Sequence, residues 1–130
     1  MGALLASLLL VAVPASDHAA IEGVISQQIE DFQRDDGAAA FAFASPELQT
    51  MFGDPARFMG MVRSGYQPVY RPRSFTFGDV VENDGRIVQE VGVIGPDGVP
   101  RMALYTMEQQ PDGSWRIAGC QLVVRPVPST

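Results

Sequence analysis

The stretch "VENDGRIVQEVGVIGPDGVPRMALYTMEQQPDGSW", residues 81–115, decides the fold because three glycine-containing turns separate its runs of strand character. Asn-Asp-Gly at 83–85 and Pro-Asp-Gly at 96–98 and 111–113 are typical of tight hairpin turns, in which glycine supplies a positive φ. Connections this short make neighbouring strands antiparallel. We therefore expect four strands in one antiparallel meander, over residues 74–82, 86–94, 99–109 and 114–124.

A long amphipathic helix is predicted over residues 17–34, with Ser16 or Asp17 as the N-terminal cap. Its apolar stripe has helical spacing and consists of Ile21, Val24, Ile25, Gln28, Ile29 and Phe32. Its solvent-facing side consists of Glu22, Gln27, Glu30, Asp31 and Arg34.

Three short helices are expected next. The first is the alanine-rich segment at 37–44, which follows the capping residues at 35–36. Ser-Pro at 45–46 and Asp-Pro at 54–55 are typical helix starts, and the two helices that they begin should end at Gly53 and Gly65. The segment "YQPVYRPRS" at 66–74 holds two prolines and is predicted to be irregular.

Helices followed by an antiparallel meander predict an α+β fold, in which the N-terminal helices pack on one face of a curved four-stranded antiparallel sheet. The 130 residues are enough for one domain and not for two. We assign this single domain to residues 16–124 and a loose tail to 125–130.

The first residues, "MGALLASLLLVAVPAS", contain an apolar run at 3–13 that is too short to span a bilayer as a helix. Small residues follow at 13–15, where a signal peptidase would cut. We predict a signal peptide over residues 1–15 and a periplasmic or secreted location. No positive charge precedes the run, so either the start is misassigned and a basic segment is missing, or the run is an uncleaved anchor, which would be the only membrane attachment. The alternative to an export signal is an amphipathic first helix.

Composition excludes several classes of function. Nine arginines stand against fifteen acidic residues, and this net charge of −6 argues against a nucleic-acid partner. The chain has no lysine for Schiff-base chemistry. With Cys120 and His18 each the only residue of its type, the chain cannot build a four-ligand zinc site alone. We expect neither a metal nor a cofactor.

The long first helix, the pattern Asp-Gly-Ala-x-x-Phe at 36–41, the Ser-Pro-Glu-Leu helix start and the closing "DGSWRIAGCQLV" resemble a bacterial family catalogued as domain of unknown function 4864. The resemblance covers about residues 20–124. That family in turn resembles the nuclear transport factor 2-like, or cystatin-like, cone folds. This resemblance implies helices closed over a bent sheet, often with a cavity. The superfamily includes small isomerases and dehydratases, ligand-binding modules and dimerisation domains, so no functional residue is carried over.

Asp79 is the candidate for acid–base chemistry. Enzymes of this superfamily commonly pair Asp with His, but His18 stands at the start of the domain and is expected to be solvated. Asp79 alternates with Phe75 and Phe77, and a carboxylate among apolar side chains could act as a base. The alternative is a strand that turns Asp79 out to solvent.

Other candidates are suited to ligand binding. Tyr105 and Gln121 fall on neighbouring strands, and Gln121 is expected on the face of Trp115 and Ile117, where it could orient a ligand or bond to the core backbone. Five of the seven phenylalanines lie between residues 32 and 58, beside three methionines, which suits core packing, an adaptable pocket or a subunit interface.

Two pairs of residues complete the candidate site. Phe41 and Phe43 lie about 200° apart on a helix, so they must contact different neighbours, either as pocket wall or as core. Arg71 and Arg73 flank a proline and would share one side of an extended chain, where they could hold a carboxylate or phosphate or pair with acidic residues.

The sequence therefore predicts an exported, non-enzymatic domain. We expect it to bind a small apolar or amphipathic ligand or to form a homodimer through its sheet. The alternative is a cofactor-free isomerase or dehydratase that uses a buried carboxylate.

Overall fold

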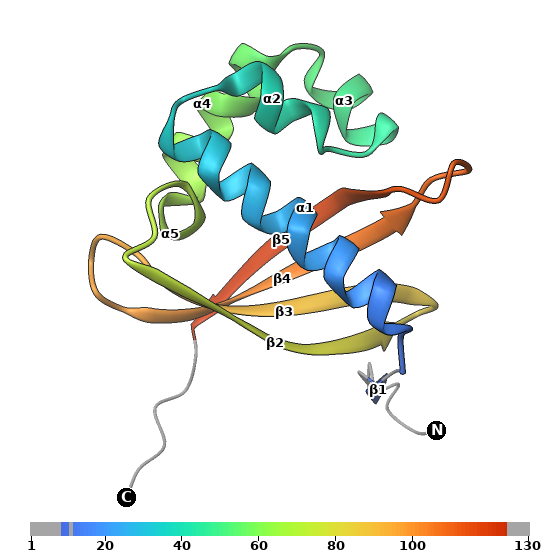
Figure 1. Cartoon of the computed structure of the whole chain (residues 1–130). Coiled ribbons are helices and arrows are strands. Elements are labelled where there is room, and N and C mark those ends of the chain that lie inside the picture. The colour runs from blue at the N-terminus through green and yellow to red at the C-terminus, as the bar shows by residue number, and fades with distance from the viewer. Residues whose placement is uncertain (1–8, 11, 125–130) are drawn as a thin grey trace, which may run out of the picture.

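The computed structural model describes residues 9–10 and 12–124 and confirms the α+β fold. The helices lie together on one face of an antiparallel sheet (Figure 1). The helices are α1 (Ala15–Gln33), α2 (Gly37–Ala42), α3 (Pro46–Phe52), α4 (Pro55–Gly65) and α5 (Gln67–Tyr70). The strands are β1 (Leu9–Leu10), β2 (Ser74–Asn83), β3 (Arg86–Ile94), β4 (Pro100–Gln109) and β5 (Trp115–Val124), and they pair in that order.

The four predicted strands are the four long strands of the sheet. The two-residue β1 adds a fifth, paired with β2, inside the segment predicted as a signal peptide. Residues 1–8 and 11 of that segment and the predicted tail at 125–130 lie outside the described residues, whereas residues 12–14 lead into α1, which begins at Ala15. No helix in the described part of the chain combines the length and the apolarity needed to cross a bilayer.

The hairpin turns form for the reason that the sequence indicates. Asp84 and Gly85 adopt φ values of 52° and 76°, as the turn between β2 and β3 requires. Gly98 and Gly113 have φ values of 74° and 90° in the next two turns.

The starts of the short helices are capped as predicted. The side chains of Asp36, Ser45 and Asp54 each accept a hydrogen bond from the backbone N–H three residues later. The predicted cap of α1 is wrong, because that helix begins earlier and Pro14 stands at its cap position. The Pro14 carbonyl accepts the N–H groups of Asp17 and His18.

The segment at 66–74 is not wholly irregular as predicted, because its first part forms the single helical turn α5. Pro68 is tolerated in this first turn, where a helix leaves N–H groups without partners. Pro68 also packs on Gly95, just after β3, so closely that a Cβ on Gly95 would lie 2.8 Å from the Pro68 Cα.

The core lies between α1 and the face of the sheet that the helices cover, called the inner face. Ile21, Ile25 and Ile29 of the predicted stripe are completely or almost completely buried. Asp31 was predicted on the solvent side, but it is only 1% exposed. The chain turns back after α1 and packs α2 against it, so this part of α1 has neighbours on two sides.

Two bulges reverse the inside–outside alternation of the sheet. In β2, the residues at 78–79 together oppose Glu90 of β3. In β5, Ala118 is the extra residue, because Ile117 pairs with Met107 while Gly119 pairs with Thr106. Beyond each bulge, the side chains that simple alternation assigns to one face lie on the other.

Candidate functional site

A pocket of about 380 Å³ lies between the helical layer and the inner face of β4 and β5. This volume falls within the usual range for small-ligand sites. The pocket is lined by Gln28, Phe32, Ala44, Leu48, Met51, Phe52, Phe58, Met61, Val62, Tyr66, Val69, Tyr105, Ile117, Gly119 and Cys120. Within the described chain, none of these lining residues is charged.

An aromatic cluster forms one wall of the pocket. The ring of Phe58 lies at its centre, 6.2 Å from the ring of Phe32 and 5.6 Å from that of Phe52 between centroids. Helix α3 supplies flexible apolar side chains beside this wall, including Met51, whose residue is 66% exposed. The pocket thus combines a rigid aromatic wall with an adaptable rim.

Tyr105 is the most deeply buried polar residue of the pocket lining, at 1% exposure. Its hydroxyl has no hydrogen-bond partner among the described residues. Burial raises the pKa of this hydroxyl well above its usual value, so that it stays protonated. The other polar side chains of the lining are engaged: Tyr66 donates to the Cys120 carbonyl over 2.9 Å, and the amide nitrogen of Gln28 donates to Ala40 over 3.0 Å.

Cys120 faces Tyr105 across the β4–β5 pair, and the two side chains are close without meeting in a regular hydrogen bond. Burial raises the pKa of the Cys120 thiol to about 12, and the nearby Tyr105 hydroxyl works against this rise. The thiol is therefore neutral and a poor nucleophile near neutral pH.

Of the predicted ligand residues, only Tyr105 lines the pocket. Phe41 and Phe43 instead pack against the hydrophobic core. The Phe41 ring lies behind the wall, 5.4 Å from that of Phe58, and the Phe43 carbonyl accepts the N–H of Ile117. Phe41 thus supports the aromatic wall through its ring, and Phe43 holds Ile117 of the lining through its backbone.

The two bulges explain why the candidates Asp79 and Gln121 do not line the pocket. Asp79 is exposed at the bulge in β2, so the expectation that it points where Phe75 and Phe77 point is wrong. Gln121 lies beyond the bulge in β5 and is exposed opposite Leu104, on the face away from Trp115. The residue brought to the pocket in its place is Cys120.

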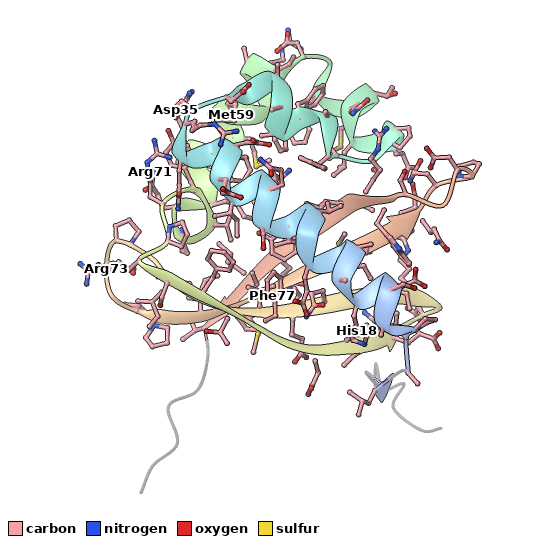
Figure 2. All side chains as sticks on the ribbon, viewed as in Figure 1. His18, Asp35, Met59, Arg71, Arg73 and Phe77 are labelled. Atoms are coloured by element: carbon pink, nitrogen blue, oxygen red, sulfur yellow. The ribbon has the colours of Figure 1, made fainter. Side chains whose placement is uncertain are left out.

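Arg71 and Arg73 do not converge on one anion site, whereas the alternative prediction, pairing with an acidic residue, holds for Arg71. Figure 2 shows Arg71 beside Asp35, and an ion pair of 3.0 Å joins them. The guanidinium of Arg71 also lies 4.0 Å from the centre of the Tyr70 ring. Arg73 lies apart from this cluster and donates to the Pro96 carbonyl over 2.8 Å.

His18 lies near the start of α1, whereas the α1 residues of the pocket, Gln28 and Phe32, lie in its C-terminal half (Figure 2). In the described part of the chain, His, Cys, Asp and Glu form no group of three or more that could hold a metal.

The concentration of phenylalanines and methionines between residues 32 and 61 favoured an adaptable pocket as one of three alternatives. Met51, Phe52, Phe58 and Met61 of this group line the pocket, whereas Leu48, which also lines it, was not a candidate. Composition alone could not show which of them face a pocket and which face the core.

Searches of curated proteins and of solved structures found no match to this chain. The family described as "Domain of unknown function (DUF4864)" matches residues 14–130, which include all five helices and the four long strands. A match over most of the chain shows membership, and the protein therefore belongs to the DUF4864 family.

Proposed function

We propose that this protein is a non-catalytic domain that binds a small apolar or amphipathic ligand in the pocket. The observation that carries the proposal is a space of about 380 Å³ lined by uncharged side chains, with one buried and unpartnered hydroxyl. Pockets that bind small molecules have this character: mostly apolar walls and a few convergent polar groups.

The general energetics of apolar cavities and buried hydroxyl groups support the same proposal. Unfilled apolar space reduces the stability of a small domain, and so does a buried hydroxyl without a partner. A ligand that fills the pocket would offset both costs. The alternative of a carboxylate-based isomerase or dehydratase gains no support, because Asp79 is exposed and does not line the pocket.

Thermal unfolding of the full chain with panels of lipids and hydrophobic metabolites tests the proposal. A ligand of the folded state raises the Tm. Leu48→Arg places a charge in the pocket lining and should abolish the rise. Thr50→Arg adds the same charge at an exposed position of α3 outside the lining and should preserve it. No rise with any compound, or an equal rise in both variants, would contradict the proposal.

Export to the periplasm or the medium is part of the proposal. It is supported by the apolar run at 3–13 and the small residues at 13–15. The proposed cut after Ala15 falls at the first residue of α1. Cell fractionation and the intact mass of the protein in each fraction test it. An unprocessed chain in the cytoplasm would contradict export.

A second candidate function, pairing of two copies through the sheet, is supported by a separate observation. Ile94, Met102 and Leu104 are half-buried, and Val123 is exposed, on the outer face, which the helices do not cover (Figure 1). Leu104→Arg should dissociate such a dimer, whereas Ala56→Arg on the exposed side of α4 should not. Sedimentation velocity measures both variants, and a monomeric wild type at high concentration would exclude the pairing.

A further inference from the structure

Among the described residues that line the pocket, Tyr105 carries a fully buried hydroxyl that has no hydrogen-bond partner. The Tyr66 hydroxyl and one of the two N–H groups of the Gln28 amide already donate to backbone carbonyls. The Cys120 thiol is a weak donor. Two other buried oxygens without a partner among the described residues, Oδ2 of Asp31 and Oε1 of Gln89, belong to residues outside the lining.

The arrangement of the neighbouring strands keeps this hydroxyl in place. Tyr105 lies in the middle of β4, with Gln89 opposite it on β3 and Cys120 opposite it on β5. The Gln89 side chain is fully buried and held by the carbonyls of Gly78 and Glu90. A fixed donor in an apolar space is suited to recognising one acceptor at one depth.

The ligand that such a pocket favours is neutral. No charged side chain of the described residues lines the pocket, so a buried carboxylate or phosphate would have no counter-ion. The hydroxyl and the thiol are themselves neutral near neutral pH. The chain's net charge of −6 adds a further penalty for an anion.

We propose that the pocket selects a neutral, mostly apolar ligand that carries a carbonyl, as in a ketone, aldehyde or ester, and that the Tyr105 hydroxyl donates to this carbonyl. The proposal rests on the ligand-binding function proposed above and names its ligand class. Tyr105 acts here as the specificity-determining residue.

Three matched compounds test the ligand class by equilibrium dialysis against the full chain: 2-acetylnaphthalene, 2-isopropylnaphthalene and the 2-naphthoate anion. The first two share a skeleton and nearly a shape, but only the ketone accepts a hydrogen bond. The measured quantity is the ratio of the ketone's affinity to the hydrocarbon's. Tyr105→Phe should lower this ratio about three- to tenfold. Tyr70→Phe removes a tyrosine hydroxyl outside the lining and should leave the ratio unchanged.

The outcomes separate the two proposals. If both neutral compounds bind but the ratio is the same in wild type and Tyr105→Phe, the carbonyl inference is wrong and the binding function stands. If 2-naphthoate binds the wild type as tightly as the ketone does, the selection for neutral ligands is wrong. If neither neutral compound binds, the general binding function fails as well. Thermal unfolding of each variant shows that it is folded before its ratio is compared.

Discussion

At the scale of single residues, the hydroxyl of Tyr105 is enclosed without a hydrogen-bond partner, so folding removes it from water without compensation. Tyr105→Phe keeps the ring and removes this cost. We expect the free energy of unfolding without ligand to rise by about 1 kcal/mol, measured by urea denaturation. Tyr66→Phe should lower it by about 1 kcal/mol, because it breaks the bond to the Cys120 carbonyl. A loss of stability in Tyr105→Phe would show that the hydroxyl has a partner.

The raised pKa of the Cys120 thiol predicts how the free energy of unfolding depends on pH in the alkaline range. Burial raises its pKa from 9.0 to about 12, so the folded chain retains a proton that the unfolded chain releases. The contribution to stability is fully present below about pH 9 and is lost as the pH rises towards 12. Between pH 8 and 11, the free energy of unfolding should fall more steeply in the wild type than in Cys120→Ala. Parallel slopes would show that the thiol is exposed.

At the scale of elements, α5 is fixed to the end of β3 through a contact that requires glycine. A Cβ on Gly95 would lie 2.8 Å from the Pro68 Cα, and backbone at this distance must shift. Gly95→Ala should destabilise the protein by about 1–3 kcal/mol in urea denaturation. Gly23→Ala, where a Cβ meets nothing within 4 Å on the exposed side of α1, should stabilise it by about 0.5–1 kcal/mol. Equal effects at both sites would contradict the close contact.

The elements differ in how far local sequence predicts them. The helix starts at Ser45 and Asp54 depend on a cap followed by proline, and the hairpins depend on Asp-Gly turns, so both can be read within a few residues. The bulges cannot, because each depends on pairing with a different strand. The bulge at 78–79 is stabilised by Gln89 of β3, which lies eleven residues from Gly78 in the sequence. The side-chain amide nitrogen of Gln89 donates a hydrogen bond to the Gly78 carbonyl. Alternation alone therefore put Asp79 and Gln121 on the wrong face.

At the scale of the whole molecule, the pocket is the space left where the helical layer meets the sheet. Its lining comes from α1, α3, α4, α5, β4 and β5 and from residues beside them. Sequence reasoning identified Tyr105 because its strand has an evident pattern. It also indicated the phenylalanine and methionine cluster as a candidate pocket. It could not separate the residues of this cluster that line the pocket from those in the core, because that depends on how the helical layer packs on the sheet.

The carboxylate of Asp35 connects parts of the helical layer that are distant in the sequence. Its lowered pKa predicts how the stability of the protein changes in acid. Asp35 follows α1, yet it accepts a hydrogen bond from Tyr70 and pairs with Arg71 at 3.0 Å and Arg63 at 3.8 Å. The bond from Tyr70, followed by the nearby arginines, lowers the pKa of Asp35 below its ordinary 3.8. A lowered pKa means that the contribution to stability is present above about pH 3.8 and is lost as the pH falls through the folded value.

Asp35→Asn tests this link with little disturbance of the backbone, because asparagine also tolerates the φ of 53° found here. We expect the variant to be less stable than the wild type at pH 7, because the amide cannot pair with Arg71. The difference in the free energy of unfolding should shrink as the pH falls below about 4, where the wild-type carboxylate takes up its proton. Urea denaturation at several pH values between 7 and 2.5 measures it. A difference that stays constant across this range would mean that the charge of Asp35 does not stabilise the junction between α1 and α5.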